Sequence, residues 1–259
     1  MIKLNGIVVP EGHFPDGSLK IDFQSEIKLP YYLTWLYEND AELFTVICIR
    51  KHFAKESMVL EMPYCPHARM DRVENQKSIF TLKYFADEIN NLNFSEVRIL
   101  DPHSNVCVAL INNVKVEKAD GIVNTIIQEP TNEELVLFYP DEGAMKRYAG
   151  CFKREYAFGI KQRDWITGKI KSFDLVNKDA VKGKDVLIID DICSRGQTFY
   201  YSAKALKEAG AKRIYLFVTH CENTILDSEL LSSGLIEYVY TTNSIFTRKH
   251  ERVKVFNLW

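Results

Sequence analysis

The chain has 259 residues, of which 46% are hydrophobic and 26% are charged, and its formal net charge at pH 7 is −2. This composition is typical of a folded globular protein with one large domain or two moderate ones. It lacks the basic excess of a nucleic-acid-binding protein, and no apolar run is long enough to span a membrane. We therefore expect neither nucleic acid nor a membrane among its partners.

The first half of the chain alternates apolar runs with one helical pattern. Residues 43–50 and 57–64 are predicted to be strands, and residues 96–101 form a third that ends on Asp101. Over residues 78–92 the apolar side chains recur every three or four positions, which predicts one buried face of a helix. This order of elements is typical of an α/β fold.

The second half continues the same alternation. A helix is predicted over residues 143–156, a strand over 186–190, a helix over 198–210 and a strand over 213–219. Gly210 ends the helix predicted over residues 198–210, as glycine often does at the end of a helix. Strand–helix–strand units of this length imply parallel sheets with right-handed crossovers.

The polar stretch QEPTNEE, residues 128–134, is the best candidate for a linker. It divides the chain into two halves of similar size. We therefore predict an α/β protein with two domains, residues 1–130 and residues 131–259.

The six cysteines are scattered, and none forms a C-x-x-C pair. In a chain of this length that pattern favours reduced thiols over a disulfide framework or a zinc site. The first residues lack the pattern of a signal peptide, because charged and turn-forming residues interrupt the apolar positions too early. We expect a cytoplasmic protein.

The segment VLIIDDICSRGQT, residues 186–198, places two aspartates at the end of a buried strand. Ligands of open α/β sheets bind beyond the carboxyl ends of the strands. The turn that follows leads into a helix, whose first N–H groups and dipole suit a phosphate. Carboxylates accept hydrogen bonds from ribose hydroxyls, so the segment predicts a ribose-phosphate site. The simpler alternative, in which Asp191 is a helix N-terminal acid and Ser194 a cap, explains only one of the two acids.

Several further segments support a more specific interpretation. They are GHFPDGS (12–18), MPYCPHARMDR (62–72), RILDPHS (98–104), YPDEGAMKRYAG (139–150), GIKQRD (159–164), VKGKDVLIIDDI (181–192), VTHC (218–221) and YTTNSI (240–245). In this order they resemble segments of the ribose-phosphate diphosphokinases, also called phosphoribosyl-diphosphate synthetases. The resemblance extends from about residue 12 to residue 246.

The resemblance implies two tandem type I phosphoribosyltransferase-like domains, with parallel sheets flanked by helices, in a homo-oligomer. It implies Mg²⁺-dependent transfer of the β,γ-diphosphoryl group of ATP to the anomeric 1-hydroxyl of a ribose 5-phosphate, which releases AMP. The ATP side would be the N-terminal domain and the ribose-phosphate side the C-terminal one. By the same resemblance, Lys161 and Arg163 would be catalytic, on a mobile closing loop; Phe14, Asp16, Arg69 and Asp71 would bind ATP; His103 and Asp141 would bind the metal; and Asp190, Asp191, Cys193, Ser194, Arg195, Gly196, Gln197 and Thr198 would bind the ribose phosphate.

The turn departs from the family pattern. Family members have DDMIDTAGT or a similar sequence where this chain has DDICSRGQT, so Ser194 replaces an acid, and Arg195 and Gln197 replace small residues. An arginine at this position could pair with a second phosphate. The acceptor is therefore either ribose 5-phosphate or the larger ADP-ribose, and the second would place the chain in NAD metabolism, as in diverged relatives from bacteriophage.

Two other classes remain as alternatives. A phosphoribosyltransferase needs the same ribose-phosphate turn, but it has no use for the ATP-side segments. A non-catalytic regulatory subunit of the same family would have lost catalytic segments that are present here. His67 and Cys193 are set aside as nucleophiles, because direct diphosphoryl transfer needs no covalent enzyme intermediate.

Overall fold

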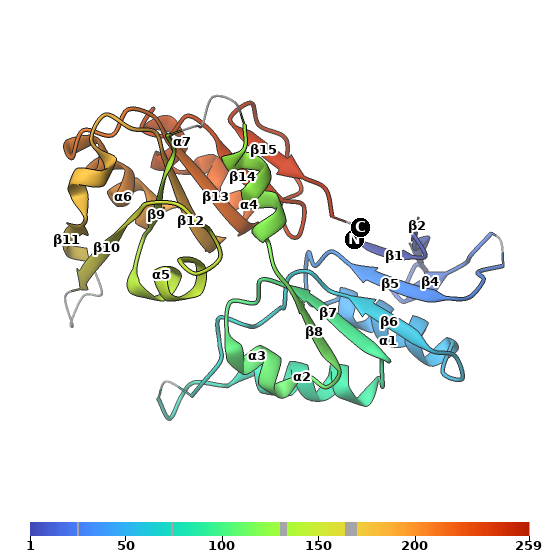
Figure 1. Cartoon of the computed structure of the whole chain (residues 1–259). Coiled ribbons are helices and arrows are strands. Elements are labelled where there is room, and N and C mark those ends of the chain that lie inside the picture. Colours follow the sequence, from blue (N-terminus) through green and yellow to red (C-terminus); the bar gives the residue numbers. More distant parts are fainter. Residues whose placement is uncertain (25, 74, 130–133, 164–169, 259) are drawn as a thin grey trace. The chain divides into compact units, whose positions relative to one another are not determined.

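The computed structural model describes the whole chain except residues 25, 74, 130–133, 164–169 and 259. The described chain forms two units, residues 1–118 and residues 119–258 (Figure 1). Each unit is built around its own sheet. None of the helices in these described ranges is both long and apolar enough to cross a membrane.

The N-terminal unit contains a six-stranded sheet with the strand order β2-β1-β5-β6-β7-β8. The strands β5 to β8 are parallel, whereas β1 runs antiparallel to both of its neighbours. A separate hairpin, β3–β4, precedes β5. The strand bounds are β1 Ile2–Leu4, β2 Ile7–Val8, β3 Glu11–His13, β4 Leu19–Ile21, β5 Tyr31–Trp35, β6 Met58–Glu61, β7 Glu96–Leu100 and β8 Val114–Glu117.

The helices α1 (Glu42–His52), α2 (Thr81–Asn91) and α3 (Asn105–Leu110) share one hydrophobic core with this sheet. Alternate residues of each strand face the helices, as the period of two of a strand requires. The predicted strands at residues 57–64 and 96–101 and the predicted helix over residues 78–92 are confirmed as β6, β7 and α2.

The predicted strand over residues 43–50 is wrong, because these residues belong to α1. A short continuous apolar run fits a buried strand and a buried helix equally well. In the structure the buried positions of α1 are Thr45, Val46, Ile49 and Arg50, which are spaced as on one face of a helix, while Phe44 is exposed.

The C-terminal unit contains a seven-stranded sheet with the strand order β11-β10-β9-β12-β13-β14-β15. All neighbouring strands in it are parallel except β10 and β11, which form an antiparallel pair. The strand bounds are β9 Val136–Tyr139, β10 Tyr156–Arg163, β11 Ile170–Val176, β12 Val186–Cys193, β13 Ile214–Cys221, β14 Val239–Thr242 and β15 Val253–Phe256.

Helices cover both faces of this second sheet, and the two faces form separate cores. On one face, α6 (Gln197–Glu208) and α7 (Glu229–Ser232) pack against Ile188 and its neighbours. On the other, α4 (Asp120–Ile127) and α5 (Glu142–Tyr148) pack against Ile189 and its neighbours. The short helices η2 (Lys178–Val181) and η3 (Asn223–Asp227) complete the unit.

Four sequence predictions for this unit can be compared with the structure. The predicted strands at 186–190 and 213–219 and the helix at 198–210 are confirmed as β12, β13 and α6. The predicted helix over residues 143–156 is too long, because α5 ends at Tyr148 and Tyr156 already belongs to β10.

The division of the chain also differs from the prediction. The structure separates the units between Lys118 and Ala119, not at residue 130, because α4 contributes Val123 and Ile126 to the core of the second unit. Part of the predicted linker, residues 130–133, lies outside the described residues.

Candidate active site

The order in which the chain adds strands to the C-terminal sheet reverses between the parallel neighbours β9 and β12. The chain continues from β9 to β10 on one side, whereas β12 and the later strands lie on the other side. In open α/β sheets, ligands bind at the carboxyl ends of the strands at such a reversal. Asp141 follows β9 closely, and Asp190 and Asp191 lie near the end of β12, so the topology brings all three predicted site residues to this edge.

The three carboxylates at this edge interact unfavourably with one another. Burial and the nearby charges of Asp191 and Asp141 raise the pKa of Asp190 well above its usual value. Asp191 is buried, and its Oδ2 accepts a hydrogen bond from Nη1 of Arg147 at 3.1 Å. Arg147 lies on α5, and its guanidinium stabilises the charge of Asp191. The edge therefore carries excess negative charge around Asp190.

Asp141 also has a structural role. Its side chain is the N-cap of α5, where Oδ1 accepts a hydrogen bond from the backbone N–H of Ala144 at 2.9 Å. Its predicted metal partner, His103, belongs to the N-terminal unit. Within the described ranges, no group of three or more His, Cys, Asp or Glu side chains is arranged to hold a metal ion.

The turn after β12 is shaped by Gly196, the N-cap of α6. Its φ of +68° lies in the left-handed region, and a Cβ atom there would lie 2.8 Å from Cδ2 of Leu230. Gln197 and Thr198 then begin α6, where the first N–H groups of a helix have no intrahelical acceptor. The structure thus places the predicted turn, from Cys193 to Thr198, at the N-terminus of a helix.

Ser194 makes a contact that the sequence did not indicate. Its hydroxyl donates to Oε2 of Glu222 at 2.6 Å, and Thr224 Oγ1 donates to the same oxygen at 3.2 Å. Glu222 directly follows β13, and its backbone N–H donates to the carbonyl of Cys193. The contact fixes one side of the turn. Cys193 itself is buried, consistent with a packing role.

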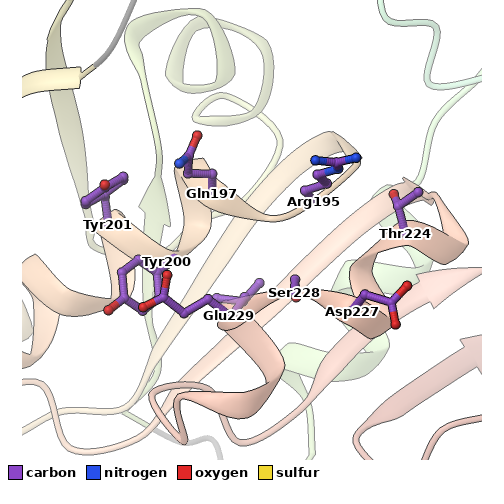
Figure 2. Close-up of a pocket in the computed structure, with 9 residues that line it drawn as sticks. Arg195, Gln197, Tyr200, Tyr201, Thr224, Asp227, Ser228 and Glu229 are labelled. Carbon is purple, nitrogen blue, oxygen red and sulfur yellow. The ribbon is translucent and has the colours of Figure 1, made fainter.

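A pocket of about 480 Å³ lies beside this turn, and Figure 2 shows it. Its lining residues come from the turn, α6, η3 and α7: Arg195, Gln197, Tyr200, Tyr201, Thr224, Asp227, Ser228, Glu229 and Leu230. Arg195 and Gln197, the two large residues that replace small ones in the family pattern, are both exposed and both belong to this lining.

In the N-terminal unit, two loops that were predicted to bind ATP and metal meet at Asp71. Ser104 Oγ donates to Asp71 Oδ2 at 2.6 Å, and Arg72 Nε donates to Oδ1 at 2.8 Å. These hydrogen bonds, together with the neighbouring His103, lower the pKa of Asp71. Ser104 is also the N-cap of α3, so the pair joins the loop after β6 to the start of that helix. Arg69, in the same loop, is exposed.

The hairpin β3–β4 presents the other two residues predicted to bind ATP. Phe14 is 51% exposed, at the turn between the strands. Asp16 Oδ1 accepts hydrogen bonds from the backbone N–H and the hydroxyl of Ser18 at 2.9 and 2.6 Å, and the hydroxyl lowers the pKa of Asp16 most. An exposed aromatic ring beside a carboxylate can contact a base and its exocyclic amine.

Comparisons with known proteins agree with this geometry. Residues 166–257 match the sequence family described as "Phosphoribosyl synthetase-associated domain". The chain is 27% identical over 256 residues to a ribose-phosphate pyrophosphokinase of Sulfurisphaera tokodaii, which covers 90% of this chain and 82% of that protein. It is 25% identical to the enzyme of the same name from Mycoplasma pneumoniae, over 99% of this chain and 82% of that one.

A solved structure shares the fold. The phosphoribosylpyrophosphate synthetase of Mycobacterium smegmatis superposes with a TM-score of 0.76 over 98% of this chain and 88% of that one, at 19% identity. This likeness confirms the predicted α/β class of two tandem phosphoribosyltransferase-like domains with parallel sheets flanked by helices.

The chain is therefore similar, over nearly its whole length, to the ribose-phosphate pyrophosphokinases. It is an enzyme of that type.

In this pyrophosphokinase relative, Lys161 and Arg163 belong to β10, and their backbones pair with Phe173 and Ile170 of β11. The predicted closing loop over residues 161–174 is therefore partly an antiparallel pair of strands. Its central residues 164–169, and the side chains of Lys161 and Arg163, lie outside what the structure describes. Their catalytic role stays a prediction.

Proposed function

We propose that this pyrophosphokinase relative transfers the β,γ-diphosphoryl group of Mg-ATP to the anomeric 1-hydroxyl of a ribose 5-phosphate moiety. The observation that carries the proposal is the pair Asp190–Asp191 at the strand reversal, directly followed by a glycine turn that opens α6. The named activity of the relatives supports the same reaction.

We assign the following roles to the site residues. Asp190 and Asp191 accept hydrogen bonds from the ribose 2- and 3-hydroxyls, and the turn from Cys193 to Thr198 binds the 5-phosphate. The 1-hydroxyl oxygen then attacks the β-phosphorus, its proton is released, and the bond from that phosphorus to the oxygen bridging to the α-phosphate breaks, so AMP leaves. Catalysis of this step is mainly positioning and charge neutralisation, the task of Lys161 and Arg163.

Magnesium suits the donors at the strand reversal. Of these, Asp141 is the predicted metal residue, and its carboxylate is an oxygen donor of the kind that this ion prefers, directly or through water. His103 stays its predicted partner. Burial, and after it the charges of Asp191 and Asp141, raise the pKa of Asp190, and a cation would offset that negative charge. When bound with ATP, the ion would neutralise phosphate charge. Phe14, Asp16, Arg69 and Asp71 are the candidates for binding the nucleotide.

For the acceptor, we propose that Arg195 extends the site to a second phosphate, so that ADP-ribose is accepted as well as, or in place of, ribose 5-phosphate. Arg195 is exposed beside Gly196 and lines the pocket next to the turn. A guanidinium in that place suits a diphosphate. With ADP-ribose as the acceptor, the enzyme would act in NAD metabolism. As a separate proposal, we expect the protein to be a homo-oligomer in the cytoplasm.

The test is AMP release from Mg-ATP with no acceptor, with ribose 5-phosphate and with ADP-ribose. Acceptor-dependent AMP is expected, and its absence with both acceptors would overturn the proposed reaction. Arg195→Ala should lower kcat/KM about tenfold or more for ADP-ribose and much less for ribose 5-phosphate, the size of a charge-assisted hydrogen bond. An equal loss with both acceptors would exclude the second-phosphate role of Arg195.

A further inference from the structure

The pocket beside the phosphate turn is larger than a 5-phosphate requires. Its volume of about 480 Å³ lies within the range of small-molecule sites in proteins. It is continuous with the turn, because Arg195 and Gln197 belong to both. Tyr200 and Tyr201 extend the lining along the first turn of α6. A ligand whose phosphate binds at the turn can therefore continue into this pocket.

One side chain in the pocket indicates a missing polar partner. Ser228 is 8% exposed, and its hydroxyl oxygen is buried without a hydrogen-bond partner in the part of the chain that the structure describes. Buried hydroxyls are nearly always hydrogen-bonded, to protein, water or ligand. In Figure 2, Ser228 lies between Glu229 and Asp227, on the side of the pocket across from Arg195.

The charges of the lining select the kind of group that fits. Arg195 provides positive charge next to the turn, whereas Asp227 and Glu229 place carboxylates on the opposite side (Figure 2). The neighbouring Glu229 carboxylate raises the pKa of Tyr200. Carboxylates repel a further phosphate but accept hydrogen bonds from hydroxyl and amine groups.

The tyrosines complete this selection. Tyr201 is 38% exposed and presents a ring to the pocket. Aromatic rings of this kind stack on the faces of bases. The lining thus proceeds from a cation near the turn to an aromatic surface and hydrogen-bond acceptors farther away.

We propose that this pocket binds the nucleoside of a diphosphate-linked acceptor, with its base on Tyr201 and its hydroxyl or amine groups on Glu229, Asp227 and Ser228. The inference rests on the proposed function, because it assumes that the turn holds the phosphate next to the reacting ribose. It adds a specificity site that ribose 5-phosphate, which ends at the turn, does not reach.

The experiment is titration calorimetry of ADP-ribose and ribose 5-phosphate on the full chain, with AMP release measured in parallel. The variants are Glu229→Gln and Tyr201→Ala. The matched control is Glu208→Gln, an exposed acid at the far end of the same helix α6. Thermal melting confirms that each variant is folded.

We expect Glu229→Gln and Tyr201→Ala each to weaken ADP-ribose binding about tenfold, and to leave ribose 5-phosphate binding within about twofold, because a ligand hydrogen bond or stacking contact is worth that much. Glu208→Gln should change neither. Unchanged ADP-ribose binding in both variants, or an equal loss for both acceptors, would overturn the nucleoside site.

Failure of the proposed reaction would appear separately. Absence of AMP with both acceptors overturns the diphosphoryl transfer. The binding titrations still decide the pocket in that case, because binding needs no turnover.

Discussion

The two units are built from similar elements, but the order of the strands in their sheets differs. In the N-terminal unit the parallel strands β5 to β8 follow one another in a single direction, and α1 to α3 share one core with them. In the C-terminal unit the order reverses between β9 and β12, and helices cover both faces. Only such a reversal opens a crevice between neighbouring strand ends. The residues that we predict to bind the ribose phosphate all belong to the second unit.

The same contrast holds for single carboxylates. Asp71 of the first unit accepts hydrogen bonds from Ser104 and Arg72, and its pKa is lowered. Asp190 of the second unit is half-buried near Asp191 and Asp141, and burial together with their charges raises its pKa. Asp71 therefore stabilises its own fold, whereas Asp190 costs stability at neutral pH, as residues positioned for a ligand often do.

The largest effect should follow from Asp190→Asn. The change removes a carboxylate that we assign to a ribose hydroxyl, so kcat/KM should fall about 100-fold or more. Stability should rise at neutral pH. The pKa of Asp190 is higher in the folded state, which therefore holds the proton more tightly, so stability falls as pH rises from the unfolded pKa through the folded one. An asparagine side chain cannot ionise, so the variant escapes this loss.

The measurements are AMP release and melting temperature between pH 4 and pH 8. The melting temperature of Asp190→Asn should exceed that of the wild type most clearly at the upper end. A variant that is less stable at pH 8, or that keeps full activity, would contradict the contrast between the two carboxylates.

Two left-handed glycines sharpen the comparison between the turns. A Cβ at Gly196 would meet Cδ2 and Cβ of Leu230 at 2.8 and 3.2 Å, and the second of these atoms cannot rotate away. A Cβ at Gly17, in the turn between β3 and β4, would meet nothing within 4 Å. Gly196→Ala should therefore cost about 2–4 kcal/mol of unfolding free energy, from strain and overpacking together, and Gly17→Ala about 1–2 kcal/mol, from strain alone.

Urea unfolding of the two variants checks this difference. The closer packing at Gly196 should also shift the turn, so Gly196→Ala should bind ribose 5-phosphate more weakly than the wild type. Equal unfolding costs at the two positions would mean that α7 moves aside without penalty.

The sequence predicted the elements with a clear period and the residues that follow their ends. The pattern of α2 allowed only one assignment, whereas the short apolar runs of α1 and β12 each allowed two, and the strand assignment was wrong for α1. Arg147 and Glu222 gave no sequence signal. Their contacts, with Asp191 and Ser194, join residues 44 and 28 positions apart, and they depend on the packing of α5 and on the register of β12 with β13.

The smallest effect that we predict concerns Asp71. Asp71→Asn weakens the hydrogen bonds with Ser104 and Arg72 and should cost about 1–2 kcal/mol of unfolding free energy at neutral pH.

Because the folded state lowers the pKa of Asp71, the contribution of Asp71 to stability is complete above the unfolded pKa of about 4 and is lost as pH falls through the folded pKa. The stabilities of the two proteins should thus converge as the pH falls below the lowered pKa of Asp71. The matched control is Asp22→Asn, which removes an exposed ion pair with Lys20 and should cost less than about 0.5 kcal/mol. Urea unfolding at pH 7 compares the two variants. If Asp71→Asn lowers the unfolding free energy no more than Asp22→Asn does, then the hydrogen bonds of Asp71 do not stabilise the contact between its two loops. The carboxylate of Asp71 must then be explained by ligand binding, as for Asp190.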